Sequence, residues 1–369
     1  MSLSGAFDPS VAYDATPPQR SWGGQSSEGP FILMTPAALV MTGRAGRRYP
    51  ATMKRLALAL VLLLSLAATA RADYPEKPIR LIVPFPPGGV TDVVARQLAE
   101  RLAADLGQPV MVDNKTGAGG VIASDLVAKA PADGYTLLLT TPNHTINAAF
   151  RASMPYDTEK DIRPIAIVGQ VPMLLVSHPS LPVTTFKEFV DYARKNPNRI
   201  NVSNAGNGTL PHITMELMML RLQFQVTNVP YRGAMPALQD LVAGQVQAKL
   251  DNYTQSAQLI AQGKLNLLAV TSDARLKQFP QVPTVAETLP GFEGYLWMGV
   301  VAPAATPDPV VAKLAAAIKR FVSQPETQAR FEKDGIEPGD DGPEEFRTII
   351  GLEIKQWREI ARVSRITVD

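Results

Sequence analysis

Cysteine is absent from the 369-residue chain, which excludes disulfide bonds, thiolate metal sites and cysteine nucleophiles. Histidine is scarce as well. His144, His178 and His212 are the only three, and they lie far apart in the sequence. Structural zinc sites gather Cys and His ligands at short, regular spacings. We therefore expect no metal site.

A strong charge of one sign is also lacking. The chain has 36 Lys and Arg residues against 34 Asp and Glu residues, and the balance from residue 73 onward is slightly acidic. Nucleic-acid-binding domains usually carry a clear basic excess, because contacts to phosphates supply much of their affinity. The sequence gives no support for a nucleic-acid partner.

One long uncharged apolar run occurs, at Leu56–Ala70, directly after Lys54 and Arg55. The sequence Ala70-Arg71-Ala72 that ends it is typical of a signal-peptidase site. The run is shorter than the roughly 20 residues of a membrane span. We predict a signal peptide over 53–72, cleaved after Ala72, with an N-terminal membrane anchor as the alternative. Export would place the mature protein outside the cytoplasm.

Residues 1–52 precede this signal peptide and are rich in Ser, Gly and Pro, without an amphipathic period. A signal peptide is normally N-terminal. We interpret the segment as a non-native extension from a start site assigned too far upstream, and we expect it to be disordered. N-terminal sequencing of the secreted protein would test this.

Strand-like and helical runs alternate from residue 79 onward, which predicts an α/β fold. In the first block we expect strands at 79–85, 109–114 and 135–141, helices at 91–106 and 121–130, and a β-rich stretch at 161–179. In the second we expect strands at 200–204, 224–231, 246–253 and 265–272, and helices at 184–197, 213–222 and 234–245. Helical sequence follows at 307–335 and 343–362. Two such blocks predict two lobes with a cleft between them, where small-molecule sites are common.

Two glycine-rich loops, "PFPPGGVTD" (84–92) and "NAGNGTLPH" (204–212), each join an expected strand to an expected helix. Backbone N–H groups at helix N-termini bind anions. The first loop lacks the lysine of a P-loop, and neither it nor the segment "GAGGVIAS" (117–124) matches a dinucleotide fingerprint. Neither of the two loops contains Arg or Lys, so a carboxylate fits better than a phosphate. The alternative for Gly88-Gly89 is a simple strand-to-helix turn.

Catalysis has little support in the sequence. No Gly-x-Ser-x-Gly elbow occurs, and the nearest candidate pair is Thr209 with His212, three residues apart. Nucleophilic hydrolysis also needs an orienting acid. We expect a binding protein and not an enzyme.

The sequence resembles the Bug family, the extracytoplasmic solute-binding receptors (TctC) of tripartite tricarboxylate transporters. The matching segments run in order over nearly all of residues 74–369. They include "YPEKPIRLIVPFPPGGVTDVVARQLAERL", "VDNKTGAGGVIAS", "DGYTLLLTT", "NVSNAGNGTLPHI" and "VPYRGAMPALQDLVAGQVQ". The ordered set is much more specific than any single segment.

The resemblance implies a periplasmic, two-lobed Venus flytrap fold, similar to type II binding proteins. On this basis residues 73–172 and 298–369 form lobe 1, and residues 173–297 form lobe 2. It implies no cofactor, a small organic carboxylate as ligand, and delivery to integral-membrane transporter subunits by a monomer. The open alternative is a sensor that presents the carboxylate to a membrane kinase.

The resemblance also implies which residues bind the ligand. In the first loop these are Phe85, Gly88, Gly89, Thr91 and Asp92. In the second they are Asn204, Gly206, Asn207, Gly208, Thr209 and His212. Thr141 and Asn143, in the loop 140–145, and Asp251 would line the variable side of the pocket. We expect Asp92 to act through water or a loop N–H group, because a carboxylate cannot donate to an anion.

The pair Pro86-Pro87 departs from the family pattern, in which small residues are frequent. A second proline removes one N–H donor and stiffens the loop. Ligand identity stays open among C4 dicarboxylates, citrate-like tricarboxylates, acidic amino acids and aromatic carboxylates such as terephthalate.

Overall fold

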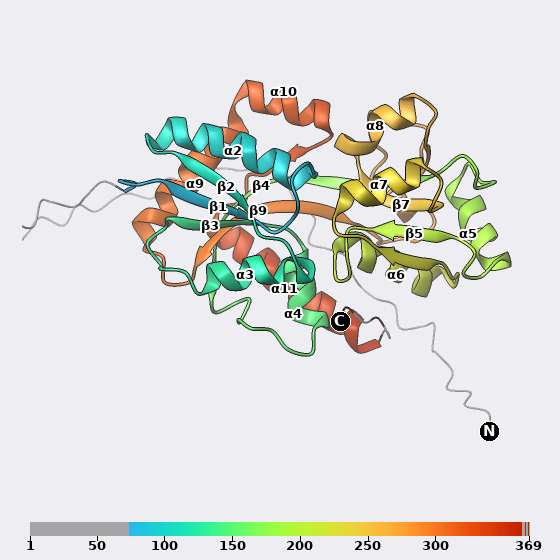
Figure 1. Ribbon diagram of the computed structural model, residues 1–369, viewed down its shortest axis with the longest axis horizontal. Coiled ribbons are helices and arrows are strands. Elements are labelled where there is room, and N and C mark those ends of the chain that lie inside the picture. Colours follow the sequence, from blue (N-terminus) through green and yellow to red (C-terminus); the bar gives the residue numbers. More distant parts are fainter. Residues whose placement is uncertain (1–73, 364–365, 367, 369) are drawn as a thin grey trace, which may run out of the picture. The chain divides into compact units, whose positions relative to one another are not determined.

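Ten strands form one continuous sheet in the computed structural model, which describes residues 74–363, 366 and 368 (Figure 1). The predicted extension 1–52 and signal peptide 53–72 lie outside the described residues. Within the described part of the chain, no helix combines the length and apolarity needed to cross a bilayer.

The first half of the sheet has the strand order β2-β1-β3-β9-β4. Its strands are β1 (Ile79–Val83), β2 (Val110–Asn114), β3 (Thr136–Thr140), β4 (Ile162–Ser177) and β9 (Tyr295–Pro303). β1 runs parallel to β2 and β3, whereas β9 is antiparallel to β3 and β4. A short strand, β10 (Glu337–Pro338), adds to β4.

The second half contains β5 (Asn201–Asn204), β6 (Thr227–Pro230), β7 (Ala248–Asn252) and β8 (Asn266–Val270). β5 lies between β6 and β7 and is parallel to both. The two halves share β4. Its residues 162–172 pair with β9, and residues 173–177 pair with β7 and β8. The α/β prediction is confirmed, whereas the bounds of the two lobes stay a prediction.

The helices are α2 (Val90–Leu106), α3 (Val121–Ala128), α4 (Asn143–Phe150), α5 (Phe186–Lys195), α6 (Leu210–Leu222), α7 (Ala234–Val242), α8 (Tyr253–Ala261), α9 (Asp308–Ser323), α10 (Pro325–Asp334) and α11 (Pro343–Val363). Short 3₁₀ turns occur at Ala118–Gly120 and Val285–Glu287.

Helices cover both faces of the first half-sheet. Leu81 of β1 belongs to the core cluster that contains residues of α2 and α9. Its neighbour Ile82 points to the other face, into a cluster with residues of α3 and α11. Burial on both sides explains why β1 has almost no polar residue, as is usual in parallel sheets.

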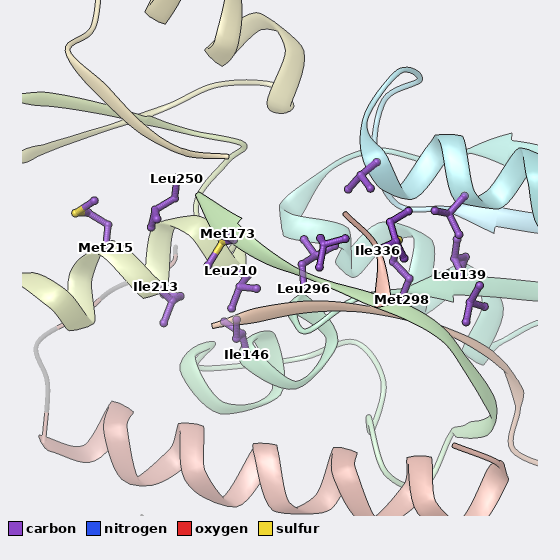
Figure 2. Close-up of a cluster of buried hydrophobic side chains, with 14 of the residues drawn as sticks. Leu139, Ile146, Met173, Leu210, Ile213, Met215, Leu250, Leu296, Met298 and Ile336 are labelled. Atoms are coloured by element: carbon purple, nitrogen blue, oxygen red, sulfur yellow. The ribbon is translucent and has the colours of Figure 1, made fainter. Parts of the chain in front are cut away.

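The core continues into the second half of the fold. Figure 2 shows Leu139, Met298 and Ile336 near one end of this cluster and Ile213, Met215 and Leu250 near the other. The Met-rich face of α6, which is much more typical of core packing than of a cofactor site, is indeed buried at Met215, Met218 and Met219.

Two helices begin where the sequence predicts loops or strands, and both affect the site. α4 begins at Asn143, inside the predicted loop 140–145, with Pro142 at its N-cap. Proline is tolerated there because the first helical N–H groups lack intrahelical partners. α8 follows β7 directly, with Asn252 as its N-cap.

Candidate functional site

A cavity of about 120 Å³ lies where strands of both half-sheets end. Its lining comes from the loop after β1, the loop after β5, the start of α7, the end of β7 and single residues of α4, β4 and β9. The lining residues are Phe85, Pro86, Pro87, Gly89, Val90, Thr91, Asn143, Met173, Ala205, Thr209, Pro211, Arg232, Gly233, Ala234, Met235, Pro236, Lys249, Leu250, Asn252 and Leu296.

Among the described residues, the N-caps of four helices line this cavity. They are Gly89 of α2, Thr209 of α6, Gly233 of α7 and Asn252 of α8. The side chains of Thr209 and Asn252 do not cap their own helices, and Gly89 and Gly233 have no side chain to do so. The first N–H groups of a helix have no intrahelical partner, and its N-terminus carries a partial positive charge. The partial positive charge of these helix ends favours an anionic ligand.

The first loop is held by Asp92, which is buried and lies beside the cavity. Its carboxylate accepts hydrogen bonds from the Gly88 N–H at 3.0 Å, from Arg96 at 3.0 Å and from Asn114 at 2.9 Å. Burial alone would raise the pKa of Asp92, but these bonds outweigh it and lower the pKa below its ordinary value. Asp92 thus stays ionised and positions the loop through an N–H group.

The second loop is shaped by its own side chains. The Asn204 side-chain oxygen accepts from the Gly206 N–H at 2.9 Å, and the Thr209 hydroxyl donates to the Gly206 carbonyl at 2.6 Å. The Gly208 N–H donates to Nδ1 of His212 at 3.3 Å. Burial lowers the pKa of His212, which keeps the ring neutral and able to accept this bond. These contacts fix the path of the loop.

Asn143 connects α4 to the second loop. Its side-chain oxygen accepts from the Leu210 N–H at 2.9 Å, so it satisfies one of the free donors of α6. Its amide group donates to the Gly119 carbonyl at 3.3 Å. Asn143 lines the cavity and ties together parts of both half-sheets.

A buried ion pair lies in β7. The side chain of Lys249 is only 2% exposed, and its Nζ lies 2.5 Å from Oδ1 of Asp251. The other Asp251 oxygen accepts from the Ser256 hydroxyl at 2.6 Å. Lys249 lines the cavity, and Asp251 does not.

The predicted site residues fall into two groups. Phe85, Gly89, Thr91, Asn143 and Thr209 line the cavity. The other predicted residues do not line the cavity, but each lies within a few positions of a lining residue in the sequence. They are Gly88, Asp92, Thr141, Asn204, Gly206, Asn207, Gly208, His212 and Asp251. Ligand contact remains a prediction for all of them.

Sequence reasoning missed Lys249, Asn252 and the start of α7 at 232–236. One signal was available for Lys249. It is a charged residue in the middle of a strand that is buried at every position, and lysine is almost never fully buried without a partner. The loop before α7 contains a single glycine and gave no comparable signal.

The chain matches, over residues 94–365, the family described as "Tripartite tricarboxylate transporter family receptor". The Bordetella pertussis protein BugT is 37% identical over 301 residues, which cover 80% of this chain and 92% of BugT.

Two solved structures with a similar fold come from Rhodopseudomonas palustris. Rpa4515 with adipate is 36% identical, with a TM-score of 0.75 and coverage of 79% of this chain and 98% of that one. MatC (Rpa3494) with bound malate is 33% identical, with a TM-score of 0.74 and coverage of 78% and 100%. The predicted two-lobed binding-protein fold and the family resemblance are both confirmed. The chain belongs to the TctC family of tripartite tricarboxylate transporter receptors, together with the Bug proteins.

Proposed function

We propose that this protein is a periplasmic receptor that captures a small organic carboxylate and delivers it to the integral-membrane subunits of a tripartite tricarboxylate transporter. The convergence of four helix N-termini on one cavity carries this proposal. Backbone N–H groups match a carboxylate in charge and geometry without a metal or cofactor.

The related structures support the ligand class. Rpa4515 is described with adipate and MatC with malate, and both ligands carry two carboxylates. Much of the cavity wall here is apolar, including Phe85, Met173 and Leu296. A carboxylate attached to a compact apolar body would fit both the donors and the walls.

Capture would be coupled to closure of the two lobes. The first loop belongs to one half of the sheet and the second loop to the other, so a ligand contacts both only when the lobes are together. Such a ligand stabilises the closed state because it binds the closed state more tightly than the open one. We expect a dissociation constant of about 1 μM, or about −8 kcal/mol, which suits capture followed by release.

A thermal-shift screen tests the ligand class. The purified secreted protein would be heated with succinate, adipate, citrate, aspartate and terephthalate, each beside its uncharged amide or ester. An acid present at 100 times its dissociation constant should stabilise the protein by about 2.7 kcal/mol, whereas its uncharged partner should not. If none of the acids raises the melting temperature, carboxylate capture is refuted.

Delivery to a transporter needs a separate experiment. Deleting the gene in its host should abolish high-affinity uptake of the acid that the screen identifies, and the intact gene should restore it. A gene for the Gly233→Ala variant, discussed below, should restore uptake poorly. Undiminished uptake in the deletion strain would remove the transport role while leaving ligand binding in place.

A further inference from the structure

We propose that Lys249 makes this receptor selective for carboxylates that carry a second anionic group and no ammonium group. This inference rests on the carboxylate capture proposed above and narrows its ligand class. The proposed selectivity distinguishes the candidate ligands. Di- and tricarboxylates without an ammonium group should bind well, whereas acidic amino acids should not.

The position of Lys249 is unusual. Each residue of β7 is buried, and this strand pairs with β4 on one side and β5 on the other. A lysine at this depth has lost nearly all of its hydration, which is costly unless an opposite charge or several acceptors replace the water. Because Lys249 lines the cavity, a bound ligand can supply such acceptors.

The ammonium group has donor capacity left over. It carries three N–H bonds. One points to Asp251, and the Leu250 carbonyl is a distant second acceptor at 3.4 Å. Asp251 also receives the Ser256 hydroxyl and does not line the cavity. Of this pair only Lys249 is a lining residue, so a ligand in the cavity would approach the lysine and have Asp251 behind it.

This arrangement favours one kind of ligand. Asp251 balances the charge of Lys249 within the protein itself. A ligand carboxylate would form a charge-assisted hydrogen bond with Lys249, which is stronger than a neutral one. An α-ammonium group would instead face Lys249, the Arg232 side chain at the cavity wall and several helix N-termini, all of the same sign.

The two anion-binding features reach the cavity from different half-sheets. Gly89 and Thr91 follow β1, whereas Lys249 belongs to β7. Apolar residues such as Met173, Leu250 and Leu296 also line the cavity. The matching ligand has two anionic ends and an apolar middle.

Titration calorimetry with three probes tests the inference on the unmodified protein. Adipate has two carboxylates, hexanoate has one, and 2-aminoadipate adds an ammonium group to the same six-carbon chain. Adipate should bind at least about tenfold more tightly than either of the others, as expected for one hydrogen bond to a charged group. Equal affinity for adipate and 2-aminoadipate would overturn the selectivity.

A paired variant identifies the residue responsible. Lys249→Met alone would leave Asp251 buried without its counter-ion, so Lys249→Met is combined with Asp251→Asn. The double variant should bind adipate about 10- to 100-fold more weakly and hexanoate within about twofold of the unmodified protein. Lys264→Met, at an exposed lysine in the same lobe, should change neither affinity.

The outcomes separate the two proposals. If adipate and hexanoate keep their original affinity ratio in the double variant, Lys249 is not the selector, whereas carboxylate capture stands. If no acid of any kind binds the unmodified protein, carboxylate capture fails and this inference fails with it. Should the double variant not fold, the three-probe comparison on the unmodified protein still decides the selectivity.

Discussion

Pro86, the first residue of the unusual proline pair, meets Gly233 across the cavity. A Cβ atom added to Gly233 would lie 2.9 Å from Cγ of Pro86 and 3.3 Å from its Cδ. Gly233 also has a φ of +122°, which side-chain-bearing residues rarely adopt. The proline ring therefore fits against the start of α7 only because position 233 is glycine. The two prolines have no backbone N–H groups to donate to a ligand, but Pro86 forms a contact between the two half-sheets.

Replacing Gly233 with alanine should weaken both stability and ligand affinity. The backbone conformation alone should cost about 1–3 kcal/mol of unfolding free energy, and the clash with Pro86 should add to the loss of affinity. Gly263→Ala is the control, since Gly263 has a φ of +68° and a Cβ atom added there would have no neighbouring atom within 4 Å. Adding Pro86→Ala to Gly233→Ala should recover part of the affinity. If Gly233→Ala and Gly263→Ala bind ligand equally well, the contact has no role in closure.

We expect Thr209 to affect ligand binding through the shape of its loop. Its single hydroxyl proton goes to the Gly206 carbonyl, so it is not available to a carboxylate. Thr209→Val keeps the shape of the side chain but removes this bond, and we expect ligand affinity to fall by roughly 1–3 kcal/mol in calorimetry. Thr209→Ser keeps the hydroxyl and should bind nearly normally. Equal affinities of the two variants would exclude the hydroxyl from any role.

The start of α2 depends on one carboxylate, and this dependence should appear as a pH effect. Asp92 has a lowered pKa, so its contribution to stability is complete above the ordinary Asp value of about 3.9 and is lost as the pH falls through its lower native pKa. Asp92→Asn should reduce the unfolding free energy by about 1–3 kcal/mol at pH 7. The difference from the unmodified protein should shrink below about pH 4 in urea titrations. A difference that is the same at pH 3 and pH 7 would contradict the role of the charge.

Elements with a periodic apolar pattern could be predicted from the sequence, and those without one could not. α2 was expected at 91–106 and runs from Val90 to Leu106, because Val94, Leu98 and Leu102 form one buried face. In α8, by contrast, Ser256 is the only residue among those described in that helix that is buried. A helix without an apolar stripe leaves no period to detect.

One helix at the site, α4, was also hard to predict because most of its buried side chains are polar. α4 buries Asn143, His144, Thr145 and Asn147, which are polar side chains that suggest a loop when only the sequence is known. The two glycine-rich loops, 84–92 and 204–212, could be predicted because a turn that requires glycine is encoded by adjacent residues. The contribution of β7 and of the start of α7 depends on strand pairing between distant segments, and no local pattern encodes that pairing.

At the scale of the whole molecule, β4 connects the two halves of the sheet. One strand of 16 residues takes part in both half-sheets, and its partners change between Pro172 and Met173. We expect a hinge between the lobes, of the kind that closes binding proteins around their ligands, to lie near this change of partner. In the transport role proposed above, closure around the ligand would be the event that a membrane partner detects.

Closure predicts a distance change that can be measured directly, because the chain has no native cysteine to compete for labels. Ala104→Cys in α2 and Gln239→Cys in α7 would place spin labels at exposed positions of the two lobes. Saturating ligand should shorten and narrow the distance distribution, since binding favours one closed state. A pair at Ala104 and Lys319, both in the predicted lobe 1, should not change. If the pair across the lobes is equally unaffected, the ligand is bound without closure, and a transporter would have to recognise it by other means.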